Sequence, residues 1–269
     1  MYSEAEEECR KMQPVSEYNF DNFIIGRSNQ LAFLAAKDVA YKPGETNNPL
    51  FIYSKSGLGK THLLNAIYKH IHKTSPDLAV FMVTADELVL KMINAIETKQ
   101  IDEWRRSVLS SDVLLIDDAH ILMGKEFTQA EFVYLIRNCV KRKHQVVLTA
   151  SVDPEKLPVL ESSLRSDFDR GLCADIQPID IATCRLVAID KAARSGLSLS
   201  DELLEYIISH SNGDARRIEG VINSLYAGKK LLNFNLDLTS VKCLHSQRLQ
   251  NNLHNYLDTT DVSPFSPLL

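Results

Sequence analysis

The sequence predicts an α/β fold, in which a parallel sheet lies between layers of helices and is followed by a smaller domain of helices alone. Three observations predict it. Short apolar runs alternate with helical stretches over the first two thirds of the chain, as they do in sheets that are covered on both faces. A glycine-containing loop that ends in Gly-Lys-Thr joins the first of these runs to a helix. From residue 178 onward the pattern is helical only.

Composition bounds the class of protein. The 269 residues, of which 24% are charged, suffice for one sizeable core and a small companion domain. A net charge of −5 argues against a protein that coats nucleic acid by bulk charge, although a local basic patch stays open. The five cysteines are odd in number, widely spaced and without a C-x-x-C pair, which indicates a reducing compartment and structural thiols. No apolar run could serve as a signal segment or span a bilayer, so we expect a soluble, cytoplasmic protein with no membrane partner.

The chain opens with a polar stretch, residues 1–17, that we expect to be a flexible leader. Residues 19–29 then mix aromatic and apolar side chains with turn formers, and either Ser28 or Asn29 could cap the helix expected at 30–40. This segment could supply a pocket for a flat base, or it could be a plain loop.

Residues 50–61 have the order that phosphate binding requires. Residues 50–53 form an apolar strand, and a loop of small residues then leads into a helix, so that backbone N–H groups and the positive helix end face one concavity. In such a loop Lys60 reaches the β- and γ-phosphates, and the Thr61 hydroxyl helps to hold Mg²⁺. The usual pattern begins with Gly, and Ser54 fits that position if its φ stays negative. We call residues 54–61 the phosphate loop; its small residues are Ser54, Ser56, Gly57 and Gly59.

A second apolar run, residues 112–116, ends in two carboxylates. We expect Asp117 to orient the Mg²⁺ shell and Asp118 to polarise the water that attacks the γ-phosphate. Two carboxylates after an apolar strand are common by chance, but together with the Gly-Lys-Thr loop they predict a nucleotide site for ATP or ADP. His120, just beyond, is more typical of a surface or helix-capping histidine than of a catalytic one.

A further strand is expected at 145–151. If it lies between the two strands already named, the hydroxyls of Thr149 and Ser151 would stand beside the phosphate loop, where a hydroxyl can sense the γ-phosphate. The alternative is simple turn chemistry at a strand end.

Three other features of this part of the chain complete the sheet and its helices. The strand at 78–83 is followed by two helical stretches, 86–96 and 101–109, although one helix would suffice to reach the next strand. Thr128 and Glu131 have the spacing of a capping box, which predicts a helix start at Thr128. A short helix at 160–165 and a last strand at 171–176 follow.

The helical domain is expected at residues 178–245, after a nucleotide-binding domain at 18–177 and before a disordered tail at 246–269. Its helices are predicted at 181–194, 200–210, 214–232 and 238–245. The third opens with two arginines in its first turn. Because a cation is mildly unfavourable there, Arg216 suggests an anionic partner such as a triphosphate, whereas Arg217 could pair with Asp214 or Glu219.

Taken in order, these stretches resemble the AAA+ module of the bacterial chromosomal replication initiator family, DnaA, over residues 18–245. The residues that carry the resemblance are 18–26, 48–53, 57–63, 114–118 and 216–220. The resemblance implies an AAA+ P-loop NTPase fold with ATP bound between the sheet domain and a helical lid. It places Ser151 at the sensor-1 position, Arg216 at sensor 2, and residues 86–109 at an insertion that contributes to filament geometry and contacts single-stranded DNA. The implied nucleotide contacts are Phe23, Ile24 and Ile25 near adenine, and Ser54, Ser56, Gly57, Leu58, Gly59, Lys60, Thr61 and His62 in and beside the loop.

The chain departs from the family pattern at several positions. Asp167 stands where the family has an arginine finger, and an acidic side chain cannot stabilise a neighbour's γ-phosphate, unless Arg165 or Arg170 substitutes. Phe127 replaces a basic residue that the family uses on single-stranded DNA, while Lys125 and Ile93 remain. The sequence also stops about where the helix-turn-helix domain of the family would begin, so specific duplex binding is not expected.

The leading hypothesis is therefore a DnaA-like ATP-binding protein that acts in the initiation or regulation of chromosomal replication, with at most weak ATPase activity. It would assemble with itself on ATP or bind an initiator or helicase-type protein, and contact single-stranded DNA weakly through residues 86–109 and Lys125. The alternative is an adaptor of the Hda or helicase-loader type that hydrolyses little. Asp167 favours the adaptor, but residues 13–16 match the sliding-clamp peptide of Hda poorly.

Overall fold

The structure is a computed structural model that describes residue 15, residues 17–122, 126–154 and 170–232, and residues 238 and 242. Several expectations lie outside the described residues: those on the leader up to residue 14, the helix at 160–165, Lys125, the side chain of Phe127, Arg165, Asp167, most of the helix at 238–245 and the tail. The chain divides into two compact units, Met1–Asp180 and Ile181–Leu269, and each is described by itself.

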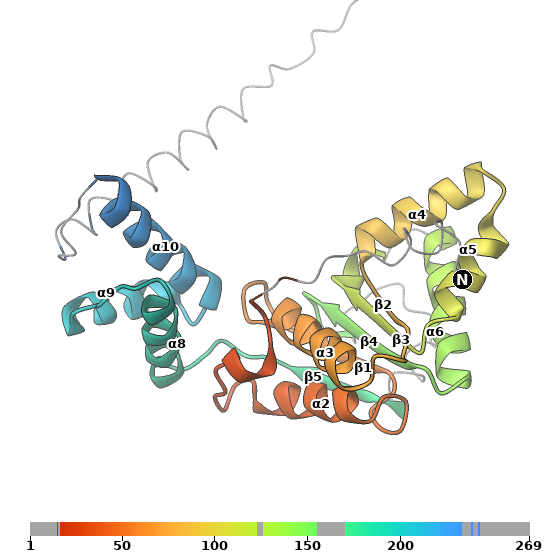
Figure 1. Ribbon diagram of the computed structural model, residues 1–269, viewed down its shortest axis with the longest axis horizontal. Helices are drawn as coiled ribbons and strands as arrows, with labels where there is room; N and C mark the ends of the chain where they lie inside the picture. The colour runs from red at the N-terminus through yellow and green to blue at the C-terminus, as the bar shows by residue number, and fades with distance from the viewer. Residues whose placement is uncertain are drawn as a thin grey trace, which may run out of the picture. The chain divides into compact units, whose positions relative to one another are not determined.

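The first unit is built on a five-stranded sheet whose strands all pair in parallel (Figure 1). The order is β2-β3-β4-β1-β5, which places β4 between β3 and β1. The predicted α/β fold with a parallel sheet is therefore confirmed. The strands are β1 (Leu50–Tyr53), β2 (Val80–Thr84), β3 (Val113–Asp117), β4 (Gln145–Ala150) and β5 (Leu172–Asp175).

Helices cover both faces of this sheet, which explains why the strands are continuous apolar runs. Alternate residues of one strand enter different cores: Leu114 and Ile116 of β3 pack in the core that includes Trp104, whereas Val113 and Leu115 pack in the core that includes Phe33. The first core is formed with α4 (Ala85–Glu97), α5 (Ile101–Leu109) and α6 (Glu126–Lys141), and the second with α2 (Gln30–Tyr41) and α3 (Lys60–Thr74). The described part of this unit also contains two 3₁₀ turns, η1 (Phe20–Asn22) and η2 (Ala119–Leu122).

The helices expected at residues 30, 101 and 181 begin where the sequence predicts, but the one expected at Thr128 does not. Helix α6 begins at Glu126, so Thr128 lies inside the helix and the predicted capping box there is wrong. Ser/Thr followed three residues later by Glu also occurs within helices, and only the first hydrogen-bonded turn decides where a cap is. A capping box does form at Thr84, whose hydroxyl accepts from the N–H of Glu87 ahead of α4. Asn29 stands at the start of α2, but its side chain makes no cap hydrogen bond to that helix.

The second unit contains three described helices that pack on one another, α8 (Ile181–Arg194), α9 (Asp201–Ser211) and α10 (Ala215–Leu232). Their shared core includes Val187, Ile207 and Ile222, all buried. Ser200 caps α9 by accepting from the N–H of Leu203. Among the described residues of the whole chain, no helix combines the length and the hydropathy that crossing a bilayer requires.

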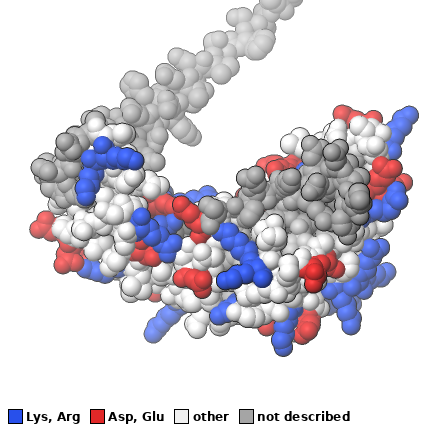
Figure 2. Space-filling view, viewed as in Figure 1, with Lys and Arg blue, Asp and Glu red and all other residues white. Residues whose placement is uncertain are grey.

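Charged side chains of both signs are interspersed over the face of the molecule in Figure 2. The described residues on this face thus carry charges of both signs, in agreement with the small net charge of the chain.

Candidate functional site

The phosphate loop joins the end of β1 to the start of α3. Gly57 and Gly59 have φ values of +88° and +105°, a region that residues with a side chain rarely adopt. At Gly59 a Cβ atom would also stand 2.9 Å from Cε2 of Phe23. Ser54 is not among the described residues with positive φ, and its N–H donates to the carbonyl of Ala150 at 3.1 Å, which extends the pairing of β1 with β4. Serine in place of the usual first glycine is thus accommodated as the sequence predicted.

Lys60 is buried, with 6% of its surface exposed. Its ammonium group folds back over the beginning of the loop, where Nζ donates to the carbonyl oxygens of Ser54 at 3.0 Å and Lys55 at 3.3 Å. The cation therefore lies within the turn whose N–H groups the sequence assigned to phosphate binding. A buried ammonium group near such N–H groups favours an anionic ligand.

Asp117, at the end of β3, is hydrogen-bonded to side chains of α3 and β4. The residue is 4% exposed, and its Oδ2 accepts from the hydroxyl of Thr61 at the start of α3 at 2.7 Å. Oδ1 accepts from the hydroxyl of Thr149 on β4. The two residues predicted to hold Mg²⁺, Thr61 and Asp117, are thus side by side. A hydroxyl and a carboxylate are oxygen donors that suit Mg²⁺, which usually takes one or two carboxylates and completes its shell with phosphate and water.

Asp118 follows directly but has a different environment. Its φ is +54°, so the chain turns sharply at the end of β3, and its side chain is 43% exposed. Its N–H donates to the Thr149 hydroxyl at 2.9 Å. Aspartate tolerates this conformation better than most residues, and such strain is often found at functional sites. One acid is thus buried and held, while its neighbour is accessible to solvent.

Ser151 lies just past the end of β4, next to the phosphate loop, because β4 is between β3 and β1 as the sequence analysis required. The Ser151 N–H donates to Nδ1 of His120 at 3.3 Å. Thr149, whose hydroxyl was also expected beside the loop, is fully buried. Its hydroxyl donates to the carboxylate of Asp117 and accepts from the N–H of Asp118. Sequence reasoning missed the role of His120, and the only available signal was its place two residues after Asp118.

The segment expected near adenine packs against the phosphate loop. Phe23 is buried, stacks on Phe33 with ring centroids 5.7 Å apart, and meets His62 edge-on at 5.1 Å. His62 also contacts the carbonyl oxygen of Asn19 through Nε2 at 2.9 Å, which requires the proton to be on Nε2. His62 thereby ties this segment to α3.

The side chain of Asn29, which makes no cap hydrogen bond to α2, instead fixes the loop that contains Ile24 and Ile25. The Asn29 amide donates to the carbonyl of Ile24 at 3.0 Å and its oxygen accepts from the N–H of Gly26 at 2.8 Å. Ile24 is half-buried and Ile25 is 47% exposed. Asn29 thus shapes the loop that presents both side chains.

The two arginines that the sequence analysis singled out in the second unit, Arg216 and Arg217, lie in the first turn of α10. Asp214 accepts from the backbone N–H groups of Arg216 at 2.8 Å and Arg217 at 3.3 Å. Nε of Arg217 also lies 3.9 Å from Oδ2 of Asp214, whereas Glu219 pairs with Lys191 at 2.8 Å. Of the two acids that the sequence offered as partners of Arg217, the structure therefore selects Asp214. Arg216 is exposed, and so is Arg170 in the first unit.

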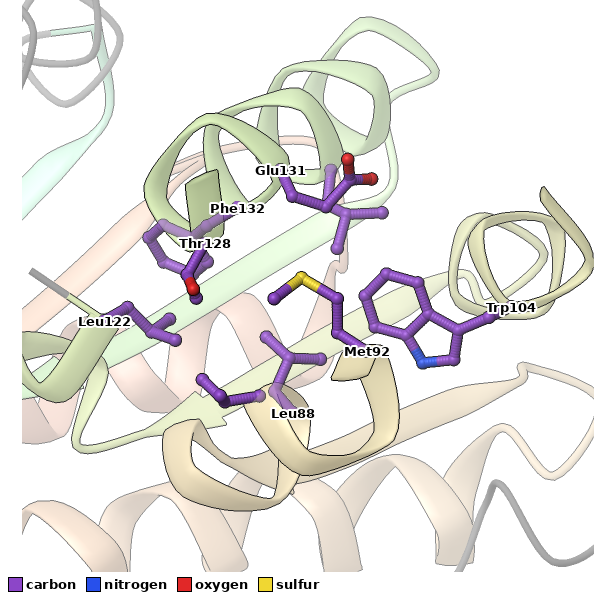
Figure 3. A pocket seen from close by; sticks show the side chains of 9 residues that line it. Leu88, Met92, Trp104, Leu122, Thr128, Glu131 and Phe132 are labelled. Carbon is purple, nitrogen blue, oxygen red and sulfur yellow. The ribbon is translucent and has the colours of Figure 1, made fainter. Parts of the chain in front are cut away.

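A small, mainly apolar pocket lies between α4, α5 and α6 (Figure 3). Its one buried polar atom without a hydrogen-bond partner is Nε1 of Trp104. Glu131 also lines it, but its carboxylate is taken by Arg105, with Nε and Nη2 donating at 2.6 and 2.7 Å. This pocket is a packing feature where α5 is fastened to α6. It is lined by Leu88, Val89, Met92, Trp104, Leu122, Thr128, Glu131, Phe132 and Leu135.

Comparison with known proteins places this geometry in context. The family of the bacterial DnaA ATPase domain matches residues 15–175. The chromosomal replication initiator protein DnaA of Caldanaerobacter subterraneus subsp. tengcongensis is 37% identical over 226 residues, which cover 84% of this chain and 51% of that protein. The chain spans about half the length of the curated relatives it matches.

Two solved structures resemble most of the chain. Domain III of the Thermotoga maritima replication initiation protein DnaA is 31% identical, with a TM-score of 0.82 over 87% of this chain and 97% of that one. A replication initiator DnaA bound to AMPPCP and single-stranded DNA is 30% identical, with a TM-score of 0.76 over 88% of this chain and 70% of that one.

Proposed function

Because the chain belongs to the bacterial DnaA ATPase-domain family, we propose that its phosphate loop binds ATP and ADP with Mg²⁺ in the initiation or regulation of chromosomal replication. The observation that carries this proposal is the 2.7 Å contact between Thr61 and Asp117, which joins the loop helix to the acidic strand end. Support also comes from the relative that was solved with AMPPCP, an analogue of ATP.

Each residue near the loop has a proposed role. Lys60 neutralises charge on the β- and γ-phosphates, and the N–H groups around Gly57 and Gly59 hold phosphate oxygens. Thr61 and Asp117 hold Mg²⁺, which when bound would neutralise the charge between the β- and γ-phosphates. Asp118 orients and polarises the attacking water, and its exposure suits that role. Further contacts are proposed for Phe23, Ile24 and Ile25 at adenine, Ser54, Ser56, Leu58 and His62 around the loop, and Ser151 and Arg216 at the γ-phosphate.

The partners are proposed from the relatives. A DnaA structure 30% identical to this chain is bound to single-stranded DNA, and we propose a weak contact of the same kind through residues 86–109 and Lys125. On helix α4 of that segment, Leu90 and Ile93 are exposed. We further propose that ATP supports self-assembly or the binding of an initiator or helicase-type protein. A second candidate, an adaptor with little hydrolysis, is favoured by Asp167 at the arginine-finger position.

Replacing the loop lysine tests nucleotide binding. We expect Lys60→Ala to weaken ATP binding about 10- to 100-fold, because a charge-assisted contact to phosphate is lost. The matched control is Lys73→Ala, an exposed lysine in the last turn of the same helix, at its end opposite the phosphate loop. Titration calorimetry measures both. Unchanged ATP affinity in Lys60→Ala would refute the assignment of the phosphate loop.

Sedimentation separates the two candidate functions. The protein would be run with ATP, with ADP and without nucleotide, each in the absence and presence of single-stranded DNA. Assembly that needs ATP would support the initiator-like function and direct attention to Arg165 and Arg170 as substitutes for the finger. A monomer that nevertheless binds ATP tightly would support the adaptor.

A further inference from the structure

His120 stands between the two strand ends that frame the proposed γ-phosphate position. Its Nδ1 accepts the N–H of Ser151 at 3.3 Å, and the same atom lies 3.9 Å from Oδ1 of Asp118. Because a backbone N–H can only donate, Nδ1 is the acceptor in this hydrogen bond, which assigns the ring proton to Nε2. The imidazole therefore spans the end of β3 and the end of β4.

Beyond the last residues of β3 and β4, side chains take over from the ladder of backbone hydrogen bonds. The N–H of Asp118 donates to the Thr149 hydroxyl of β4 at 2.9 Å, and the N–H of Ser151 donates to His120, which follows β3. Each strand end is thus held by a side chain from the neighbouring one. The exchange is reciprocal, and His120 supplies the half of it that holds Ser151.

This reciprocal exchange matters because both ends carry proposed functional groups. Asp118 is held at φ +54°, a conformation that persists only when surrounding contacts enforce it. Ser151 has no further β4 residue beyond it to keep its backbone in register with β3. A shift of about 1 Å would misalign Ser151 with a phosphate oxygen or Asp118 with the attacking water.

We propose that His120 is a positioning residue that aligns Ser151 with Asp118 and thereby sets how strongly the site distinguishes a triphosphate from ADP. The inference rests on the proposed nucleotide-binding function. His120 acts through Ser151 and is not assigned any contact with the nucleotide. Its hydrogen bond, and not its bulk, is the property that the function requires.

Two substitutions separate the hydrogen bond from the bulk of the ring. His120→Ala removes the acceptor. His120→Asn retains one, because the amide oxygen Oδ1 occupies the same place along the side chain as Nδ1. His72→Ala, which removes an exposed histidine from the last turn of α3, is the matched control. Titration calorimetry with AMPPCP and with ADP gives the ratio of the two dissociation constants for each protein.

We expect the wild type and His72→Ala to bind AMPPCP more tightly than ADP. His120→Ala should reduce this preference about five- to ten-fold, which is the loss of one hydrogen bond, while ADP affinity stays within about two-fold. His120→Asn should restore the preference to within about two-fold of the wild type. If thermal unfolding shows that His120→Ala does not fold, His120→Gln replaces it, since its amide oxygen lies one bond too far along the side chain.

The remaining outcomes distinguish the inference from the function on which it rests. An unchanged preference in His120→Ala, or an asparagine variant as impaired as the alanine variant, overturns the inference while nucleotide binding stands. Equal binding of AMPPCP and ADP by the wild type also overturns it, because there is then no discrimination for His120 to set. A wild type that binds neither nucleotide refutes the proposed function itself.

Discussion

The backbone N–H of Asp118 donates to the hydroxyl of Thr149 at 2.9 Å, and that same hydroxyl donates to the carboxylate of Asp117. One fully buried side chain on β4 therefore serves two consecutive acids at the end of β3. Asp117 is held inside the protein, while Asp118 turns toward solvent. The Thr149 hydroxyl thus helps to set the different positions from which Asp117 is proposed to hold Mg²⁺ and Asp118 to polarise water.

Removing that hydroxyl should cost stability. Thr149→Val keeps the volume of the side chain but leaves the Asp118 N–H without its acceptor and removes the hydroxyl that donates to Oδ1 of Asp117, so that Thr61 alone still donates to that carboxylate. We expect the free energy of unfolding to fall by about 1–3 kcal/mol, the cost of buried groups that lose their partners. Urea denaturation measures it. The control, Thr98→Val at the exposed end of α4, should change stability by less than about 0.5 kcal/mol. Equal stability of the two variants would contradict the proposed importance of the Thr149 hydroxyl.

A side chain at Gly59 should be tolerated poorly for two reasons. The φ of +105° is strained for alanine, and the new Cβ would stand 2.9 Å from the buried ring of Phe23. We expect Gly59→Ala to lower the free energy of unfolding by about 2–4 kcal/mol and to weaken ATP binding. Gly196→Ala is the matched control, because Gly196 has a φ of +66° with no atom within 4 Å of a Cβ, so only about 1 kcal/mol of backbone strain is expected. Similar losses in both variants would show that the contact with Phe23 adds nothing.

The ion pair that fastens α5 to α6 should show strong coupling. Arg105 binds Glu131 through two hydrogen bonds of 2.6 and 2.7 Å, and the side chain of Glu131 is only 8% exposed. Hydrogen bonding to Glu131 raises the pKa of the Arg105 guanidinium above its ordinary value, so this cation does not lose its proton. A double-mutant cycle with Arg105→Met and Glu131→Met should give a coupling of about 1.5–3 kcal/mol.

A surface pair provides the comparison for that cycle. Arg185 and Asp201 lie 2.5 Å apart, but the side chain of Asp201 is 86% exposed, so a coupling below about 1 kcal/mol is expected. Both couplings follow from urea denaturation of the single and double variants. A coupling at Arg105 no larger than that of the surface pair would contradict the inference that this contact fastens α5 to α6.

His70 should make stability fall at acidic pH. Burial, helped by nearby Lys37 and Lys73 and opposed by Asp21, lowers the pKa of its imidazole below the ordinary 6.5. The unfolded chain therefore takes up the proton first as the pH drops. The contribution of the neutral ring to the free energy of unfolding is fully present above pH 6.5. It is lost as the pH falls from there through the pKa that His70 has in the folded protein.

The measurement is the urea midpoint at about pH 7.5 and about pH 5.5 for wild type and His70→Gln. The wild type should lose more stability between these two values than the variant does. The ring of His70 packs against that of Tyr41 with centroids 4.1 Å apart, so the variant is also expected to be less stable at the higher pH. An identical pH dependence in both proteins would rule out a contribution from His70.

The phosphate loop and the strands could be predicted because their signals are local. A strand buried on both faces must be apolar at every position, as residues 50–53 and 113–116 are, and a turn at positive φ calls for residues such as Gly57 and Gly59. The sequence did not predict that β4 lies beside β1, and only stated what would follow if it lay between β1 and β3. The strand order of the sheet meets that condition. The arginine-finger question stays a prediction, since Asp167 lies outside the described residues.

The amino-acid sequence by itself determined the apolar strands, the glycine turns and the residue types at the site, because each depends on neighbours within a few positions. Only the tertiary structure decided which of those residues meet. Glu131 has the spacing of a cap but pairs with Arg105, 26 residues away, and Thr149 and His120 each act on the backbone of a residue 31 positions away. Hydrogen bonds between strand ends depend on how the sheet brings those ends together, and no periodicity along the chain records that.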